Sequence, residues 1–278
     1  MNRFGLACLV FIGLLMACTG NKASSEQEDG MDAETDSLTA DSLAKAEEAA
    51  AEVMPMGADE LFDDFFFNFA SNRKLQLERI SFPLTVQGEG KKLTISRSQW
   101  KMDAFFMQQD YYTLIFDSEQ QMDLVKDTTV SETVVEKIDL QQNHVRQYLF
   151  SRASGRWMMT GINDQTLQRN DNAPFLSFYQ HFVSDSVFQQ QCLANQMEFS
   201  GPDPDDDFQQ IEGMITPDQW GAFAPEFPQN IIYNIVYGHQ HAAATRKILV
   251  LRGIANGLEM EVTFKQHRGR WKLTKLVM

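Results

Sequence analysis

One short motif carries residues that commonly bind metal ions. His239 and His241 flank a glutamine and, in an extended segment, would place two imidazoles on one face. No third ligand follows at an obvious spacing, and the next three residues, 242–244, are all alanine. We therefore expect a loop between strands here and assign no metal ligand.

An acidic motif resembles the first half of a calcium-binding loop. Asp203, Asp205 and Asp207 alternate with other residues, as the first ligands of such a loop do. Phe208 stands at the sixth position, which requires glycine, and Met214 stands at the twelfth, which requires glutamate. The motif favours an acidic insertion loop without a bound cation.

A third group could carry acid–base chemistry. Such catalysis needs a carboxylate or histidine with a tuned pKa and a hydroxyl donor nearby. Asp110, Tyr111, Tyr112 and Asp117 surround one predicted strand. Tyr112 has a counterpart in Tyr233, which indicates a structural role, and carboxylates at strand ends are usually solvated. We assign no catalytic residue and no cofactor, and we keep an isomerase-like or dehydratase-like enzyme as the alternative.

The N-terminus carries a lipidation motif. An apolar stretch, residues 4–16, is too short to span a bilayer comfortably, and Leu15-Met-Ala17-Cys18 follows the pattern of a lipobox. The segment resembles bacterial lipoprotein signal peptides. This resemblance implies a signal peptide at 1–17, cleavage before Cys18 and acylation of that cysteine, so membrane contact would occur through the lipid anchor alone.

Cysteine usage agrees with this interpretation. Cys8 would leave with the signal peptide and Cys18 would be acylated, so Cys192 would be the one thiol of the mature body. A single thiol cannot form an internal disulfide. Its helical spacing from Phe188 favours a small buried hydrophobic residue over a catalytic thiol.

The segment that follows the signal peptide, residues 18–57, is strongly acidic. It has no aromatic residue, and the chain as a whole has a formal net charge of -14. Such composition predicts a disordered tether, because too little apolar surface is available to offset the ordering entropy. The charge also argues against nucleic acid as a partner, since phosphates require clusters of Lys and Arg.

The rest of the chain repeats itself. Residues 150–160 return as 264–274, both reading Phe-x4-Gly-Arg-Trp-x2-Thr, and Trp100 matches Trp220. Each copy opens with aromatic residues at i, i+3, i+4 and i+7, which predicts a helix facing a core. These residues are Phe62, Phe65, Phe66 and Phe69 in one copy, and Phe175, Phe178, Tyr179 and Phe182 in the other. Tryptophans that recur in this way indicate fold determinants rather than ligand contacts.

Capping residues and strand-like runs complete each copy. Asp59 is a plausible N-cap of the first helix, while Ser71 and Ser184 can cap second, shorter helices. Residues rich in β-branched and aromatic types then predict antiparallel strands, and Gly155 and Gly269 are expected to turn the chain into the terminal strand of each copy. The copies are expected at 58–168 and 172–278, with a polar boundary near 168–171.

The order of these elements resembles the nuclear-transport-factor-2-like fold, a curved, mainly antiparallel sheet wrapped around helices to form a cone. The resemblance implies an α+β protein of two tandem cone-shaped copies, and copies of this fold often pair through their sheets. With its lipobox and acidic spacer, the whole chain is similar to uncharacterised lipoproteins of Bacteroidetes-type bacteria.

These features together predict the cellular location of the protein more clearly than its activity. We expect a lipid-anchored protein of the bacterial cell envelope, on the periplasmic face or the cell surface. We expect a non-enzymatic binding or interaction role, with a protein, a glycan or a small apolar molecule as partner. Closed or purely apolar cones would favour this role, whereas a polar pocket holding a carboxylate and a hydroxyl within hydrogen-bonding reach would favour an enzyme.

Overall fold

The computed structural model describes residues 59–88, 90–203, 206–238 and 244–278, all of which belong to one compact unit. The predicted signal peptide, Cys18 and the acidic tether lie outside these residues, as do His239 and His241. Within the described part of the chain, no helix has both the length and the apolar character needed to cross a membrane.

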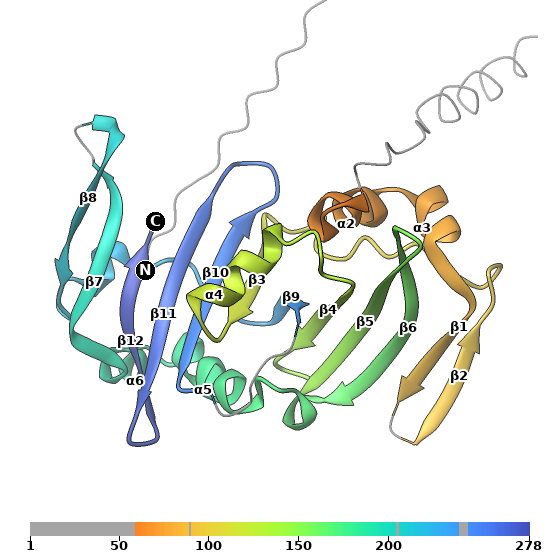
Figure 1. Ribbon diagram of the computed structural model, residues 1–278. Coiled ribbons are helices and arrows are strands. Elements are labelled where there is room, and N and C mark those ends of the chain that lie inside the picture. Colours follow the sequence, from red (N-terminus) through yellow and green to blue (C-terminus); the bar gives the residue numbers. More distant parts are fainter. Residues whose placement is uncertain (1–58, 89, 204–205, 239–243) are drawn as a thin grey trace, which may run out of the picture. The chain divides into compact units, whose positions relative to one another are not determined.

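A single mixed sheet dominates the unit (Figure 1). Its strand order is β2-β1-β6-β5-β4-β9-β3-β10-β11-β12-β7-β8. The strands are β1 (Ile80–Gly88), β2 (Lys91–Ile95), β3 (Tyr111–Phe116), β4 (Glu132–Asp139), β5 (His144–Ala153), β6 (Arg156–Thr166), β7 (Leu193–Asp203), β8 (Asp206–Ile215), β9 (Ile231–Tyr237), β10 (Arg246–Gly253), β11 (Glu259–His267) and β12 (Arg270–Val277).

The strand order reads alike from both edges. Moving inward, β2-β1-β6-β5-β4-β9 corresponds to β8-β7-β12-β11-β10-β3, each strand differing by six in chain order. β1 pairs in parallel with β6, and β7 pairs in parallel with β12. At the centre, β3 lies beside β10 and β9 lies beside β4, so each of these two strands completes the sheet of the other half of the chain. β3 and β9 pair in parallel through Thr113 and Asn234.

Two hydrophobic cores lie on opposite faces of the central strands. Leu114 packs in the core that contains the first helix, while its neighbour Ile115 packs in the core that contains the helix of the second half. Val250 and Leu249 divide between the cores in the same way. Because successive side chains of a strand point to opposite faces, one helix must cover each face of the central sheet.

The helices form where the aromatic spacing predicts them. In α2 the four phenylalanines of the predicted stripe are buried, and in α5 three of the four aromatic residues of the stripe are buried while Phe178 is partly so. The helices are α2 (Phe62–Ser71), α3 (Arg73–Arg79), α4 (Glu119–Met122), α5 (Ala173–Ser184), α6 (Ser186–Gln191) and α7 (Trp220–Phe223), with 3-10 turns η2 (Asp123–Lys126) and η3 (Leu167–Arg169).

The predicted caps were wrong by one or two residues. Asn72 and Asp185 cap the shorter helices, accepting hydrogen bonds from backbone N–H groups. Ser71 and Ser184 instead donate back to carbonyls of their own helices. Asp59 does not cap α2, because its buried carboxylate forms a bidentate ion pair with Arg79.

The recurring Gly-Arg-Trp motifs begin the last strand of each half, as the sequence predicted. Gly155 and Gly269 have φ of 78° and 77°, and Ser154 and Arg268 before them also have positive φ. Two consecutive residues in the left-handed region match the right-handed twist of a hairpin, which explains the glycine at the second position. In contrast, residues 201–203, expected within an insertion loop, continue β7.

The recurring tryptophans have matching surroundings. The indole N–H of Trp100 donates to Gln76 at 3.1 Å, and that of Trp220 donates to Gln189 at 3.1 Å. Each glutamine in turn donates to a carbonyl near the end of the preceding helix. Both tryptophans therefore tie a loop to the helices of their own half.

Candidate functional site

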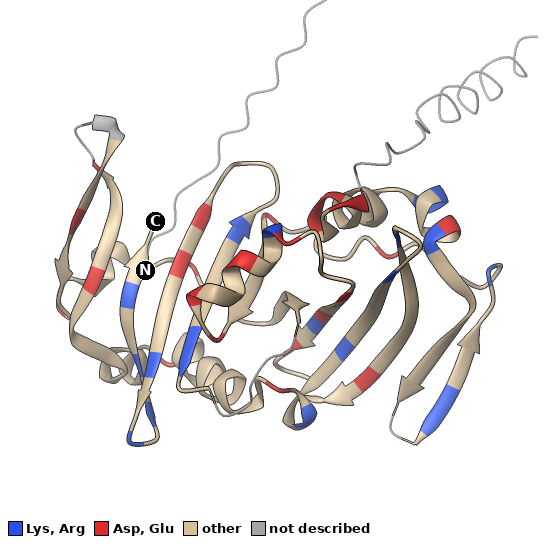
Figure 2. Cartoon of the chain, viewed as in Figure 1, with Lys and Arg blue, Asp and Glu red and all other residues tan. Residues whose placement is uncertain are grey.

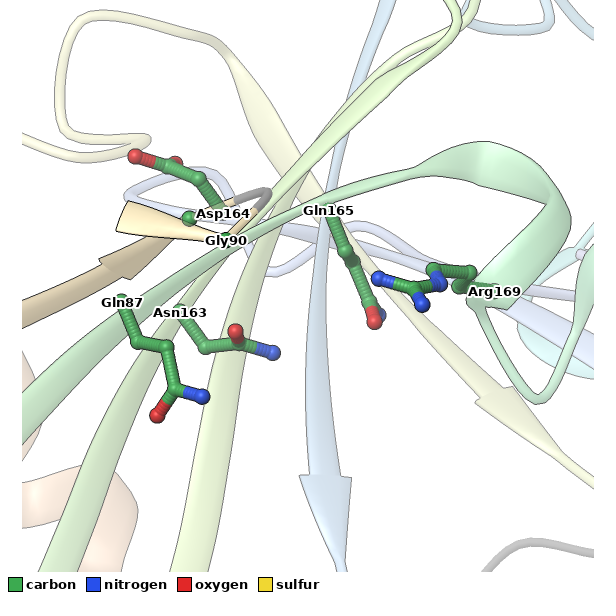
Figure 3. Close-up of a pocket in the computed structure, with 7 residues that line it drawn as sticks. Gln87, Gly90, Asn163, Asp164, Gln165 and Arg169 are labelled. Atoms are coloured by element: carbon green, nitrogen blue, oxygen red, sulfur yellow. The ribbon is translucent and has the colours of Figure 1, made fainter. Parts of the chain in front are cut away.

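A polar cavity of about 440 Å³ opens where β1 and β6 end (Figure 3). This volume lies within the range of small-molecule sites, although most such sites are more apolar. We call it the amide pocket, because side-chain amides dominate its lining. It is lined by Gln87, Gly88, Gly90, Asn163, Asp164, Gln165 and Arg169.

Strand geometry separates the lining side chains. Gln87 and Asn163 are register partners in the parallel β1–β6 pair, so they share a face of the sheet. Gln165 lies on the same face, and Asp164 points the other way (Figure 3). The Asp164 carboxylate accepts two hydrogen bonds from Arg146, at 2.8 and 2.9 Å. This carboxylate is therefore committed to an ion pair.

Arg169 supplies the positive charge of the amide pocket. It ends η3, its side chain is exposed, and it extends toward Gln165 (Figure 3). In the described part of the chain, its guanidinium has no ion pair or hydrogen bond. A guanidinium presents five N–H donors in a planar fork, which suits a carboxylate.

Asn163 also belongs to a row of polar side chains that crosses the sheet. Register pairs connect one residue from each of six neighbouring strands, from β1 to β3. We call this the polar row: Gln87, Asn163, Gln147, Glu136, Asn234 and Thr113. Exposure falls along it, from exposed Gln87 to Glu136 at 2% and Asn234 at 0%.

Hydrogen bonds connect the middle of the polar row. Asn163 donates to Gln147 at 2.7 Å, and Gln147 donates to Glu136 at 2.9 Å. Asn234 donates to the other carboxylate oxygen of Glu136 at 3.0 Å. A buried carboxylate near the centre of the sheet is thus linked to the wall of the amide pocket.

Glu136 is held by three amides. Asn170 donates at 2.6 Å to the same oxygen that Gln147 contacts. Burial raises the pKa of Glu136, and the hydrogen bonds from Gln147, Asn234 and Asn170 oppose the rise without cancelling it. This balance is expected for a buried acid whose partners are neutral donors rather than cations.

The boundary between the halves is packed onto the sheet beside Glu136. Asn170 and Asn172 are 5% and 0% exposed, although the sequence indicated a polar connection. Lys247, 1% exposed, donates to Asn172 and forms an ion pair with Asp117. The expectation that Asp117 is solvated was therefore wrong, since its side chain is 7% exposed and faces a buried ammonium.

The other acid–base candidates do not converge. Tyr112 stacks on Phe106 in one core, whereas Tyr111 packs against the other core and Asp110 is exposed. Burial raises the pKa of Tyr112 to about 12, and it also raises the pKa of Tyr111. Neighbouring residues of a strand point apart, so these groups cannot act on one substrate atom.

Metal and thiol chemistry find little support among the described residues. Within 59–88, 90–203, 206–238 and 244–278, no group of three or more His, Cys, Asp or Glu side chains could hold a metal ion. Cys192 is buried at the end of α6, and burial raises the pKa of its thiol, which keeps it protonated and unreactive. The packing of Cys192 agrees with its predicted role.

Two carboxylate–hydroxyl pairs escaped sequence reasoning. Tyr148 donates to Asp103 at 2.6 Å, and Tyr237 donates to Asp63. Burial raises the pKa of Asp63, and it raises those of both tyrosines well above the physiological range. The partners lie 45 and 174 residues apart in the chain, so no local motif could have revealed them. None of these four residues lines the amide pocket.

Aromatic side chains fill the space beneath the helices. Phe150 contacts all four phenylalanines of the α2 stripe, with ring centroids 5.3 to 6.0 Å apart. Phe264 contacts three aromatic residues of the α5 stripe at 5.2 to 5.7 Å. Charged residues of both signs are distributed over the strands outside these cores (Figure 2).

Comparisons with known proteins agree with the α+β architecture. No curated protein matches the chain. A crystal structure of a nuclear-transport-factor-2-like protein from Bacteroides fragilis NCTC 9343 is similar, with a TM-score of 0.73 and 41% sequence identity. The match covers 79% of this chain and 96% of that chain. The family model described as Domain of unknown function (DUF4348) matches residues 40–278, so the chain belongs to that family.

Proposed function

We propose that this is a lipid-anchored protein of the bacterial cell envelope that binds a small polar ligand in the amide pocket without transforming it. The single observation that carries the proposal is the chemistry of that pocket. Amide side chains and one guanidinium line it, while its carboxylate, Asp164, is paired with Arg146. Such groups recognise a ligand through hydrogen bonds but supply no free base.

The packing of the cores supports binding over catalysis. The aromatic stripes of α2 and α5 belong to the hydrophobic cores, so they fill the space between helix and sheet in which an enzyme of this fold would hold its substrate. The alternative enzyme would use Tyr148 and Asp103, which are within hydrogen-bonding reach. Tyr148 is 2% exposed and packs on Phe105, so a substrate would have to displace core side chains to reach it.

The anchor and tether complete the proposal. The lipobox ending at Cys18 would attach the chain to a membrane, and the acidic segment up to residue 57 would hold the body away from it. The family match begins within that segment, at residue 40. We place the protein in the envelope, on the periplasmic face or the cell surface.

We also propose that the body arose from two copies of one module whose third strands have changed places. The mirrored strand order supports this, as do the matching indole hydrogen bonds of Trp100 and Trp220. β3 and β9 would then be the exchanged strands. The exchange makes the halves interdependent, since each contributes a central strand to the other.

Metabolic labelling tests the anchor. Cys18→Ala should abolish incorporation of a labelled fatty acid and release the protein from the membrane fraction. Cys192→Ala is the matched control and should leave labelling unchanged, because Cys192 is buried in the fold. Labelling that persists in Cys18→Ala would contradict the proposal.

Native mass spectrometry tests the pocket. The full chain, purified gently from its host, should retain a small molecule. The Asn163→Trp variant places an indole in the amide pocket and should lose that molecule. Thr94→Trp on the exposed edge strand β2 is the control and should retain it. Retention by Asn163→Trp, or a turnover product formed by the purified chain, would overturn the proposal.

A further inference from the structure

Backbone donors fix the direction of two amides beside Glu136. Asn234 accepts from the N–H of Ile115 at 2.9 Å, and Asn170 accepts from the N–H of Asn172 at 2.8 Å. A backbone N–H can only donate, so the oxygen of each amide must face it. The NH₂ groups of Asn234 and Asn170 therefore must face Glu136, one on each carboxylate oxygen.

Glu136 in turn determines the orientation of the Gln147 amide. While Glu136 is ionised, its carboxylate only accepts hydrogen bonds, so Gln147 must turn its NH₂ group toward Glu136 and its oxygen away from it. That oxygen accepts from the NH₂ group of Asn163. The Asn163 amide oxygen, which accepts no described hydrogen bond, is consequently available to the amide pocket. A charge buried two strands away, on β4, makes this part of the pocket wall an acceptor.

We propose that the amide pocket takes a small zwitterion, such as a short peptide, with its ammonium on the Asn163 oxygen and its carboxylate on Arg169. This inference rests on the proposed function and names the ligand class of the same site. An ammonium has only donors, which matches a fixed acceptor, and the Glu136 charge lies behind that acceptor. A carboxylate matches the exposed guanidinium of Arg169.

The same geometry specifies what the pocket rejects. A ligand that places an ether or carboxylate oxygen against Asn163 would bring two acceptors together and leave both unsatisfied. Gln87 and Gln165 do not impose this selection, because no described hydrogen bond fixes their amides and each can turn to suit a ligand. Selection between donor and acceptor therefore depends on Glu136.

Three peptide-like probes test the inference on the ¹⁵N-labelled full chain. Glycyl-glycine carries the ammonium, glycolyl-glycine replaces it with a hydroxyl, and methoxyacetyl-glycine replaces it with an ether oxygen. Shifts of the backbone signals of Gln87, Gly90 and Asn163 report binding in the pocket. Wild type should bind glycolyl-glycine about tenfold more tightly than methoxyacetyl-glycine, the ratio expected for one unsatisfied acceptor pair. Glycyl-glycine should bind at least as tightly as glycolyl-glycine.

Two variants separate the contributions. Arg169→Gln should weaken the binding of glycyl-glycine about tenfold. Arg97→Gln, which changes an exposed arginine on another loop, should leave that binding unchanged. Glu136→Gln removes the obligatory acceptor beside Gln147, because the new side chain can turn either its oxygen or its NH₂ group toward Gln147, and in both orientations its NH₂ group faces one of the two fixed asparagine donors. It should bring the ratio between the hydroxyl and ether probes close to one. Asn170→Ala, which removes a donor to Glu136 without reversing the row, should preserve the ratio.

The outcomes distinguish this inference from the proposed function. Equal binding of the hydroxyl and ether probes by wild type, or an unchanged ratio in Glu136→Gln, would overturn the inference. Failure of all three probes to shift the pocket signals would overturn it too. If native mass spectrometry still finds a molecule displaced by Asn163→Trp, the pocket binds another chemical class and the proposed function stands. If it finds none, both fail.

Discussion

Thr113 of β3 and Asn234 of β9 are register partners at the centre of the described sheet, and they occupy matching positions in two similar sequence segments. The Thr113 hydroxyl donates to the carbonyl of Tyr233 at 2.8 Å, while Asn234 accepts from Ile115 and donates to Glu136. The contacts between β3 and β9 are thus made by side chains as well as by the backbone of the sheet.

Asn234→Leu should strongly destabilise the protein. The substitution removes the side-chain acceptor of the Ile115 N–H and one of three donors to the buried Glu136 carboxylate. We expect a loss of about 3 kcal/mol in the free energy of unfolding, measured by urea denaturation. Thr113→Val removes one hydrogen bond at similar shape and should cost about 1 kcal/mol. Equal costs would argue against a special role for Asn234.

Glu136 should give stability a distinctive pH dependence. Its pKa is raised above the ordinary value of 4.5, so the folded chain holds this proton more tightly than the unfolded chain does. The contribution of Glu136 to the free energy of unfolding should therefore fall as pH rises from about 4.5 through the folded pKa and then level off, by at most about 1.4 kcal/mol per pH unit. The nearby carboxylate of Asp171 acts in the same direction.

Denaturation of wild type and Glu136→Gln in parallel, at intervals from pH 4 to 8, isolates this contribution. Other titrating groups are shared and cancel in the difference between the two proteins. A difference that does not change with pH would show that Glu136 titrates normally.

Asp59 should show the opposite pH dependence. Burial alone would raise the pKa of this carboxylate, but hydrogen bonds from Arg79 and the Trp157 backbone, together with the Arg79 charge, lower it below 3.8. The stability it contributes is present above pH 3.8 and is lost as pH falls through the lowered value. Asp59→Asn should cost about 3–5 kcal/mol at pH 7, because it leaves the buried Arg79 without its counter-ion. Thermal unfolding measures the loss of stability. Asp64→Asn, at an exposed position on α2, is the control and should have little effect on stability.

Matching tryptophans should respond alike to substitution. Trp100→Phe and Trp220→Phe each remove an indole hydrogen bond to a glutamine, and each should cost about 1–3 kcal/mol. Trp157→Phe should cost less, since the buried N–H of Trp157 has no hydrogen-bond partner among the described residues. Urea denaturation of the three variants checks the order, and strongly unequal costs at Trp100 and Trp220 would weaken the proposal of two copies.

Local patterns in the sequence predicted the elements that local physics determines. The aromatic stripes gave α2 and α5, and Gly155 and Gly269 gave the last hairpins, because helical spacing and positive φ are properties of a few neighbouring residues. β1 was not predicted. Ile80, Phe82, Leu84 and Val86 alternate as a strand requires, but Pro83 lies among them and disfavours a central strand, and the burial of β1 depends on pairing with β6, more than 70 residues later.

The pairing of β3 with β10 and of β9 with β4 could not be predicted either. A strand's own residues do not specify which half supplies its neighbours, and both positions offer the same kind of surface. For the same reason the site escaped sequence reasoning: Gln87, Asn163, Gln147 and Glu136 are unremarkable amides and an acid until the register aligns them. Candidates chosen by residue type, such as Asp117, proved instead to be structural ion-pair partners.

The most direct test of the account is the side-chain amide NMR spectrum of Gln147 and Asn163 as a function of pH. If Glu136 fixes the direction of both amides, their NH₂ signals should move together, with one midpoint above 4.5, as Glu136 gains its proton, and Glu136→Gln should abolish the transition. Signals of Asn163 that stay constant while those of Gln147 titrate, or a transition that persists in Glu136→Gln, would contradict the claim that this buried carboxylate controls the pocket wall.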